Sequence, residues 1–201
     1  MYNTALGRKP NHEMPAIHDV FKSPDGKITV LQNDLCAGIS PEYYAASVIY
    51  SEPPWHSGYD KFAKNTIADG TSYRQYIDGF ERLIRVMALP ALLVCGKSDL
   101  KQYCPSDAIN ITFIATDTCS AKLLVYNPVL LPFDYKELDG KTSKEVCEII
   151  SAKCKCVLDP SCGYGNVVRN NGADYVLSDI DTDCLLWLRK EYANGLCQAR
   201  G

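Results

Sequence analysis

The chain has 201 residues, of which 46% are hydrophobic and 22% are charged, a balance typical of one globular domain with a hydrophobic core. That balance excludes a disordered tail, a collagen-like repeat and a coiled coil, and no apolar run approaches the roughly 18 residues of a membrane-spanning helix. With 21 basic and 24 acidic residues the net charge is −3, which argues against a strongly cationic nucleic-acid binder but allows a local basic patch.

The first twenty residues are polar and contain Pro10 and Pro15, so we expect an N-terminal arm over 1–26 and one domain over 27–201. They contain no apolar segment of the secretory kind, so the expected location is the cytoplasm. Strands are predicted at 28–31, 46–50, 91–95, 109–115, 122–126, 156–158 and 174–177. Helices are predicted at 72–87, 142–152 and 183–192, and shorter ones are expected to begin at Ser40 and to follow Gly165. The polar, glycine-bearing segment 56–71 indicates a loop.

Strands alternate with helices along most of this chain. That order predicts an α/β fold with a mostly parallel sheet of about seven strands and helices on both faces. The two strands at 109–115 and 122–126 follow each other directly and are expected to form an antiparallel hairpin.

The ten cysteines do not form a metal-binding pattern. The chain has no Cys-x-x-Cys, its closest pair is Cys154 and Cys156, and all three histidines precede residue 57. Without an export signal, and with several cysteines inside apolar strands, we expect reduced thiols and no metal.

A glycine-bearing loop follows the strand predicted at 156–158. It reads Asp-Pro-Ser-Cys-Gly-Tyr-Gly over 159–165, and its glycines let the backbone approach a ligand closely. Asp179 ends the next strand, where an acidic residue usually binds ribose hydroxyls. A dinucleotide site fits poorly, because Val168 occupies the third glycine position and the loop opens with an acid. A sulfonium cation with an amino-acid tail would favour that acid; the alternative is an ordinary tight turn.

A second loop, Glu-Pro-Pro-Trp at 52–55, also follows a predicted strand. Its two prolines favour a rigid, extended backbone whose carbonyl groups are acceptors. The Trp55 side chain offers a flat surface on which a base can stack, and a carboxylate with a carbonyl can accept hydrogen bonds from an exocyclic amine. The alternative is a proline-rich turn whose tryptophan covers the core.

Both loops resemble motifs of S-adenosylmethionine-dependent methyltransferases. Asp-Pro-x-x-Gly-x-Gly at 159–165 is similar to their cofactor loop. Glu-Pro-Pro-Trp resembles the [Asp/Asn/Ser]-Pro-Pro-[Tyr/Phe/Trp] motif of enzymes that methylate exocyclic amines of DNA bases. The catalytic loop comes first, as in the circularly permuted, beta-type adenine-N6 and cytosine-N4 methyltransferases. The resemblance covers about residues 27–192 and implies one Rossmann-like methyltransferase domain in a bacterial or phage-type host cell.

Weaker matches follow in family order. The segment 32–36 (Gln-Asn-Asp-Leu-Cys) is similar to a stretch whose acid contacts the adenine side of the cofactor. The segment 91–97 resembles the strand after the amphipathic helix. Residues 141–146 resemble the start of the helix before the cofactor loop only at Thr142, Lys144 and Val146.

The resemblance implies two sets of site residues and direct methyl transfer to an amine. The catalytic set is Glu52, Pro53, Pro54 and Trp55. The cofactor-binding set is Asp34, Lys144, Asp159, Pro160, Ser161, Gly163, Gly165 and Asp179. The implied cofactor is S-adenosyl-L-methionine, and the implied partner is DNA with a flipped-out base, adenine N6 being favoured over cytosine N4. We expect a monomer or homodimer without membrane contact.

Glu52 departs from the family motif by one extra methylene group. A displacement on the order of 1 Å at a reacting amine can lower a rate about 100-fold. The chain also lacks a long target-recognition segment. Two alternatives therefore stay open: a cofactor-binding relative without transferase activity, and a methyltransferase of a non-DNA amine in RNA, a nucleotide or a protein.

Some neighbouring side chains have two interpretations. His56 could assist proton removal or be incidental. Basic residues could contact phosphates or be solvated surface charges; they are Lys61, Lys64, Arg74, Lys97, Lys101 and Lys141. Tyrosines 43, 44, 73 and 76 are interpreted as packing residues.

Overall fold

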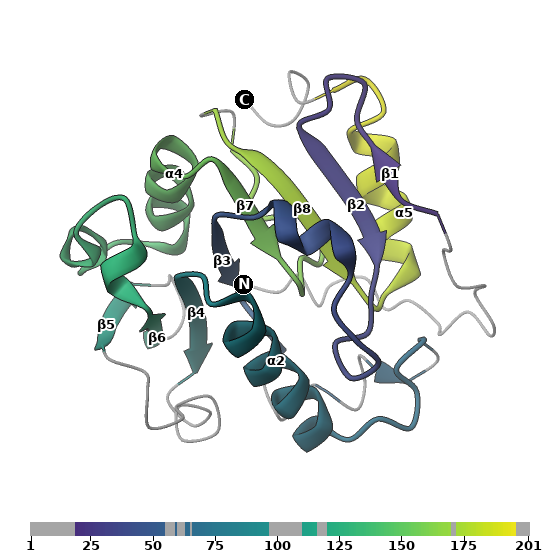
Figure 1. Ribbon diagram of the computed structural model, residues 1–201, viewed down its shortest axis with the longest axis horizontal. Helices are drawn as coiled ribbons and strands as arrows, with labels where there is room; N and C mark the ends of the chain where they lie inside the picture. Colours follow the sequence, from purple (N-terminus) through teal and green to yellow (C-terminus); the bar gives the residue numbers. More distant parts are fainter. Residues whose placement is uncertain are drawn as a thin grey trace.

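A computed structural model of the chain describes residues 19–54, 59, 63–64, 66–96, 110–115, 120–169 and 172–195. One eight-stranded sheet runs through them, in the order β1-β2-β8-β7-β3-β4-β6-β5 (Figure 1). The strands are β1 (Phe21–Lys22), β2 (Ile28–Gln32), β3 (Val48–Ser51), β4 (Ala91–Gly96), β5 (Asn110–Ala115), β6 (Ser120–Tyr126), β7 (Cys156–Asp159) and β8 (Asp174–Asp179). In the sheet, the five adjacent strands β2-β8-β7-β3-β4 are parallel to one another, while β6 is antiparallel to its two neighbours, β4 and β5. The predicted fold class and hairpin are confirmed.

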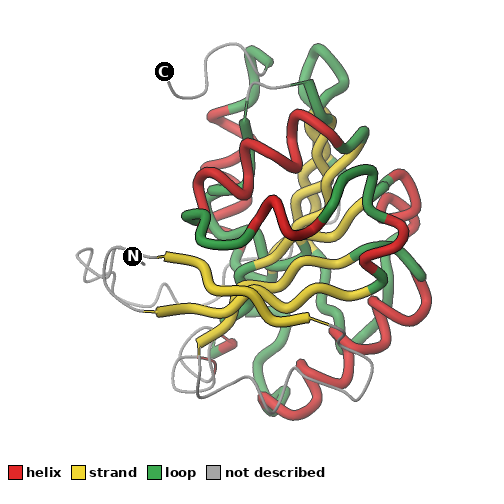
Figure 2. The backbone as a smooth tube through the Cα atoms, turned by 90° about the vertical axis from the view of Figure 1, so that its left-hand side faces the viewer, coloured by secondary structure: helices red, strands yellow, loops and turns green. Residues whose placement is uncertain are grey.

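Helices cover both faces of the sheet (Figure 2). The α-helices are α2 (Tyr73–Met87), α4 (Ser143–Lys153) and α5 (Thr182–Glu191), and the 3₁₀ helices are η1 (Pro41–Ala45), η2 (Pro128–Leu130) and η3 (Tyr135–Leu138). The apolar face of α2 packs with one side of the sheet, where it meets Ile49 and Leu93. Helices α4 and α5 pack on the other side with Tyr50 and Val157. Within the described residues, no helix has the length and apolar character to cross a membrane.

Capping residues set where the two helices nearest the candidate loops begin. The Ser72 hydroxyl accepts a hydrogen bond from the Gln75 backbone N–H, and the Gln75 side chain accepts one from the Ser72 backbone N–H. This pair is a capping box that starts α2. Thr142 and Glu145 form the same box at the start of α4. Both caps satisfy backbone N–H groups that would otherwise lack partners, so each helix begins close to where the sequence predicts it.

Three local predictions need correction. The residues after Gly165 form turns within the described part of that segment, and not a short helix. The strand expected at 46–50 begins at Val48, whereas the short helix expected to begin at Ser40 is confirmed as the 3₁₀ segment η1, with Ser40 as its N-cap. Part of the predicted polar loop 56–71 is buried, at Tyr59, Ala63 and Ala68, because these side chains pack with the α2 layer.

The short edge strand β1 uses residues that we assigned to the N-terminal arm. Phe21 and Lys22 pair with β2 in antiparallel register. The sheet therefore begins inside the range 1–26, while residues 1–18 of that range lie outside the described part of the chain.

Candidate functional site

The two candidate loops leave neighbouring strands at the same edge of the sheet. Strands β3 and β7 are parallel partners, with Val48 opposite Val157 and Ile49 opposite Leu158. At the ends of these strands the Ser51 hydroxyl donates to Asp159 Oδ1 at 3.0 Å. The segments 52–54 and 159–165 therefore begin side by side, although about a hundred residues separate them in the sequence. This edge, at the carboxyl ends of parallel strands, is where α/β folds place ligands.

Hydrogen bonds to two aspartates shape the turn at 159–165. Asp159 Oδ1 also accepts from the Ser161 amide at 3.2 Å, and Asp179 Oδ2 accepts from the Gly163 amide at 2.8 Å. Gly163 and Gly165 have φ of 49° and 70°, the left-handed region that favours glycine. The turn is thus tied to β3 through Asp159 and to β8 through Asp179.

Burial makes both aspartates weaker acids than usual, because it raises their pKa values. Desolvation raises the pKa of Asp159 to about 8, although the bonds from Ser161 and Ser51 oppose the rise and the charges of Glu52 and Asp179 add to it. Desolvation likewise raises the pKa of Asp179 to about 6. A bound cation would favour the ionised form of both groups, so Asp179 and, once a cation binds, Asp159 can supply negative charge to a positively charged ligand.

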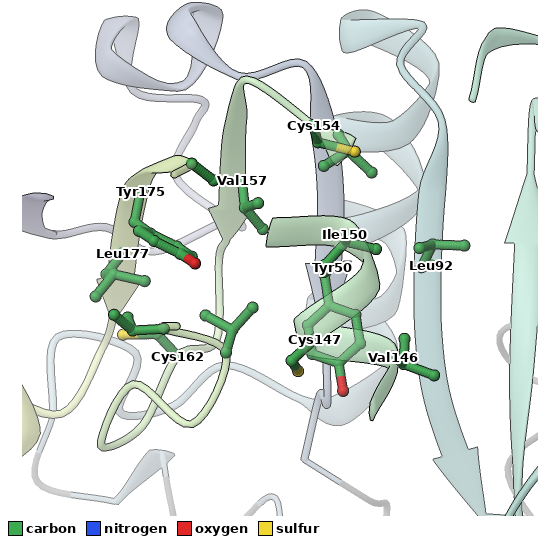
Figure 3. Packing of buried hydrophobic residues seen from close by; sticks show 14 of the residues in the cluster. Tyr50, Leu92, Val146, Cys147, Ile150, Cys154, Val157, Cys162, Tyr175 and Leu177 are labelled. Carbon is green, nitrogen blue, oxygen red and sulfur yellow. The ribbon is translucent and has the colours of Figure 1, made fainter. Parts of the chain in front are cut away.

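Glu52 is anchored by the strand that precedes it. The Tyr50 hydroxyl donates to Glu52 Oε1 at 2.9 Å. Tyr50 itself is 2% exposed and lies beside Cys147 of α4 (Figure 3). Pro53 is buried and Pro54 is half-buried, whereas Trp55 and His56 lie outside the described residues, so their proposed roles stay predictions.

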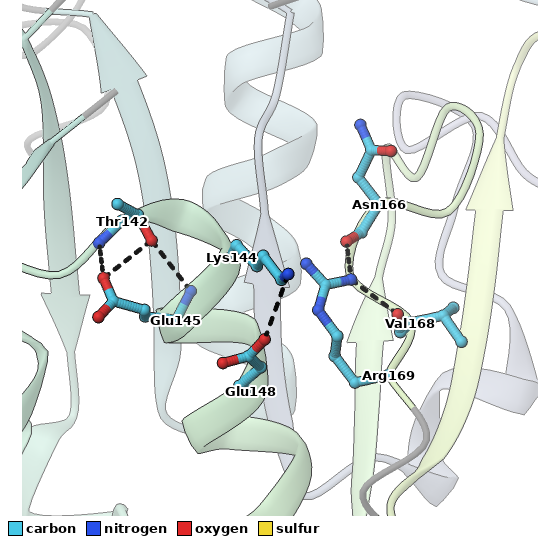
Figure 4. A network of polar contacts seen from close by, with 7 residues as sticks. All are labelled: Thr142, Lys144, Glu145, Glu148, Asn166, Val168 and Arg169. Carbon is cyan, nitrogen blue, oxygen red and sulfur yellow. Dashed lines mark hydrogen bonds and ion pairs between the residues drawn. The ribbon is translucent and has the colours of Figure 1, made fainter. Parts of the chain in front are cut away.

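The remaining predicted cofactor residues lie at different distances from the turn. Pro160 is buried next to Asp159. Asp34 follows β2, whose end pairs with Asp179, and its Oδ1 accepts from the Cys36 amide at 2.8 Å. Lys144 is exposed on the first turn of α4, with its ammonium group 4.0 Å from the Glu148 carboxylate (Figure 4). The structure therefore joins Asp34 to the site edge, while Lys144 faces solvent.

Sequence reasoning missed two hydroxyl contacts made by tyrosines that we interpreted as packing residues. The Tyr76 hydroxyl on α2 lies 2.7 Å from Ser161 Oγ in the turn. The Tyr43 hydroxyl on η1 is hydrogen-bonded to Ser178 Oγ on β8. A buried tyrosine hydroxyl usually has a hydrogen-bond partner. Tyrosines predicted to lie in the core could therefore have been expected to make such contacts.

The basic residues fall partly outside the described chain, as Lys61, Lys97 and Lys101 do. Arg74 pairs with Asp78 at 2.8 Å on the exposed face of α2. Lys141 lies 3.9 Å from Glu145, and Lys64 is exposed. The seven cysteines in the described ranges are free thiols, and no cluster of three metal-ligating side chains occurs there.

Solved structures share this fold at low sequence identity. M1.HpyAVI superposes with a TM-score of 0.51 and 12% identity over 81% of this chain and 97% of its own. TTHA0409 of Thermus thermophilus, a candidate DNA modification methylase, gives a TM-score of 0.53 and 12% identity over 87% and 96%. Its complex with S-adenosyl-L-methionine gives 0.50 and 13% over 82% and 94%. No protein-family model and no curated sequence matches the chain. At such identities the likeness establishes the fold.

Proposed function

We propose that the protein is an S-adenosylmethionine-dependent methyltransferase that methylates the exocyclic amine of a DNA base, adenine N6 in preference to cytosine N4. The observation that carries this proposal is the bond between Ser51 and Asp159, which holds the Glu-Pro-Pro segment beside the glycine-bearing turn. A neighbour in fold, TTHA0409, binds S-adenosyl-L-methionine in its solved complex. The motif order supports a beta-type, circularly permuted arrangement.

The turn at 159–165 fits the chemistry of the donor. S-adenosylmethionine supplies a methyl group on a positively charged sulfur. Asp179 would contribute negative charge close to the turn, and Asp159 would do so once the bound cation favours its ionised form; Gly163 and Gly165 allow close approach of the backbone. Pro160, Ser161 and Asp34 complete the proposed binding set, with Lys144 at its exposed margin.

The segment 52–55 would hold the acceptor. The amine of a base is a poor nucleophile, because its lone pair is delocalised into the ring. Hydrogen bonds from the amine N–H groups to the Glu52 carboxylate and the Pro53 carbonyl would localise that lone pair and orient it. Pro54 keeps the segment extended, and Trp55 would stack on the flipped base. Bound S-adenosylmethionine would supply the methyl group and leave as the neutral thioether, while Glu52 and the Pro53 carbonyl would hold the amine toward it and its proton would pass to solvent.

A binding experiment and a product experiment together test the proposal. We expect calorimetric titration to show binding of S-adenosyl-L-methionine. After incubation with unmethylated DNA, duplex and single-stranded, mass analysis of the nucleosides should show N6-methyldeoxyadenosine. Absence of binding would contradict the whole proposal. Binding without a methylated nucleoside would support S-adenosyl-L-methionine as the ligand but contradict DNA as the acceptor.

Two aspartates on the same strand provide a matched control. Asp179→Asn changes the acid at the site end of β8 and should weaken binding about 10-fold, because an ionised partner is lost. Asp174→Asn changes the exposed acid at the other end of β8 and should leave affinity unchanged. Equal effects of the two substitutions would contradict the proposed place of the donor.

The second candidate is a relative that acts on another acceptor or on none. Glu52, in place of the aspartate, asparagine or serine of the motif, favours it. The same nucleoside analysis, extended to RNA, free nucleotides and protein, separates the cases. Product on one of those acceptors alone would favour a non-DNA amine, and no product on any would favour an inactive binding protein.

A further inference from the structure

The strand that leads into the candidate acceptor segment carries a tyrosine directed at Glu52. Tyr50 and Glu52 are two residues apart in extended chain, so their side chains project to the same side. The Tyr50 hydroxyl donates to Glu52 Oε1 at 2.9 Å. No feature of the loop motif itself accounts for this contact.

Tyr50 is a rigid support for that bond. It is 2% exposed and belongs to the buried cluster that β3 forms with α4, where Val146 and Cys147 flank it (Figure 3). Its hydroxyl also interacts with Cys147. Burial, with the neighbouring Cys147 and Glu52, raises the pKa of Tyr50 well above its ordinary value. The phenol is therefore protonated at neutral pH, where it can donate to Glu52.

We propose that Tyr50 is a positioning residue that holds the Glu52 carboxylate in the orientation needed to bind the acceptor amine. This role rests on the proposed function, because it assigns the amine to Glu52. With one carboxylate oxygen held by a buried donor, few rotamers remain for the glutamate, and the place of its second oxygen is fixed as well.

The pair also explains why this chain has glutamate where the motif has a shorter side chain. An aspartate would withdraw the carboxylate from Tyr50 by one carbon–carbon bond, about 1.5 Å. A hydrogen bond between hydroxyl and carboxylate tolerates much less than that. Tyrosine two residues earlier and glutamate in the motif are thus matched in length, and we infer that they act as one unit.

Four proteins test the unit: the wild type, Tyr50→Phe, Glu52→Asp and the double variant. Each is assayed for kcat and KM of methyl transfer to DNA, for affinity for S-adenosyl-L-methionine, and for the urea midpoint of unfolding. Tyr175→Phe is the matched control, because it removes another buried tyrosine hydroxyl in the α4 layer, one that contacts Ser151 and Arg169.

We expect Tyr50→Phe to lower kcat about 10-fold to 100-fold, the value of one hydrogen bond to a charged group, with donor affinity within about twofold of wild type. Glu52→Asp should lower kcat about 100-fold. The double variant should be no worse than Glu52→Asp alone, because both changes remove the same bond. The unfolding midpoints should likewise be less than additive, and Tyr175→Phe should leave kcat unchanged.

The positioning role would be overturned if the two single substitutions lowered kcat additively in the double variant, or if Tyr175→Phe lowered kcat as much as Tyr50→Phe. An Asp variant that is more active than the wild type would also overturn it. If no methyl transfer occurs even with the wild type, the proposed function fails. The unfolding midpoints then decide on the pair separately: less than additive midpoints would still support a coupled Tyr50–Glu52 unit, and additive midpoints would overturn it.

Discussion

Asp159 is a carboxyl group that the fold removes almost completely from water. It is 4% exposed, and burial raises its pKa from an ordinary 3.8 to about 8. In the unfolded chain the same group loses its proton near the ordinary value. Between these two values the native protein therefore holds a proton that the unfolded chain has released. Stability must fall as pH rises through this window, since the unfolded state binds fewer protons there.

We therefore predict that the ligand-free protein loses stability between about pH 4 and pH 8, by an amount on the order of a few kcal/mol. Asp179 acts in the same direction up to about pH 6, the value to which burial raises its pKa. Asp159→Asn should flatten the slope above about pH 6, because the amide does not titrate there. Urea unfolding at several pH values measures the slope. A variant with the slope of the wild type would assign the titration to other groups.

The turn between β7 and β8 is the element that brings the site residues together, and Gly165 is its tightest point. A Cβ atom there would lie 2.8 Å from Leu188 Cδ2 on α5. With φ at 70° the position is also strained for any other residue. The glycine thus lets the turn pack directly on α5.

Gly165→Ala should destabilise the protein by about 1–3 kcal/mol, because backbone strain and overpacking add. Gly26 is a suitable control, since its φ is 72° but a Cβ there meets nothing within 4 Å. Gly26→Ala should therefore cost only the strain. Thermal unfolding of both variants compares the two losses of stability. Equal losses would show that the Leu188 side chain moves aside without an energetic penalty.

The elements were predictable to the extent that local pattern decides them. Apolar spacing located α2, and apolar runs ended by glycine or proline located β4 and β7. A short helix is predicted after Gly165, but Val167 is buried in a turn and Val168 in the irregular segment that follows it. The contacts of Tyr50 with Glu52 and of Tyr76 with Ser161 depend on which faces meet in space, and no spacing along the chain records that.

At the scale of the whole molecule, the site edge concentrates acids in a chain whose net charge is already −3. The proposed donor is a cation, so its binding should favour ionised Asp159 and release up to about one proton at about pH 7. Calorimetry in two buffers of different ionisation enthalpy detects that proton as a difference in heat. Asp159→Asn should abolish the difference. A wild-type heat independent of buffer would show that Asp159 keeps its proton in the complex.

The arrangement of strands was predictable only as a class. Alternating strands and helices indicated a parallel sheet, and the two loops were expected to meet because each follows a strand. The strand order confirmed that expectation by placing β3 beside β7. Which helix covers which face depends on packing across the sheet, and the sequence pattern leaves it open.

The pairing of β3 with β7 has a consequence for synthesis. Translation delivers the segment 52–54 early, but its partner Asp159 and the supporting Asp179 leave the ribosome more than a hundred residues later. A nascent chain stalled before residue 159 would already contain the segment 52–54, but it would lack the turn at 159–165 and Asp179. Competence to bind at this edge should therefore appear abruptly, only once the strands β7 and β8 have emerged.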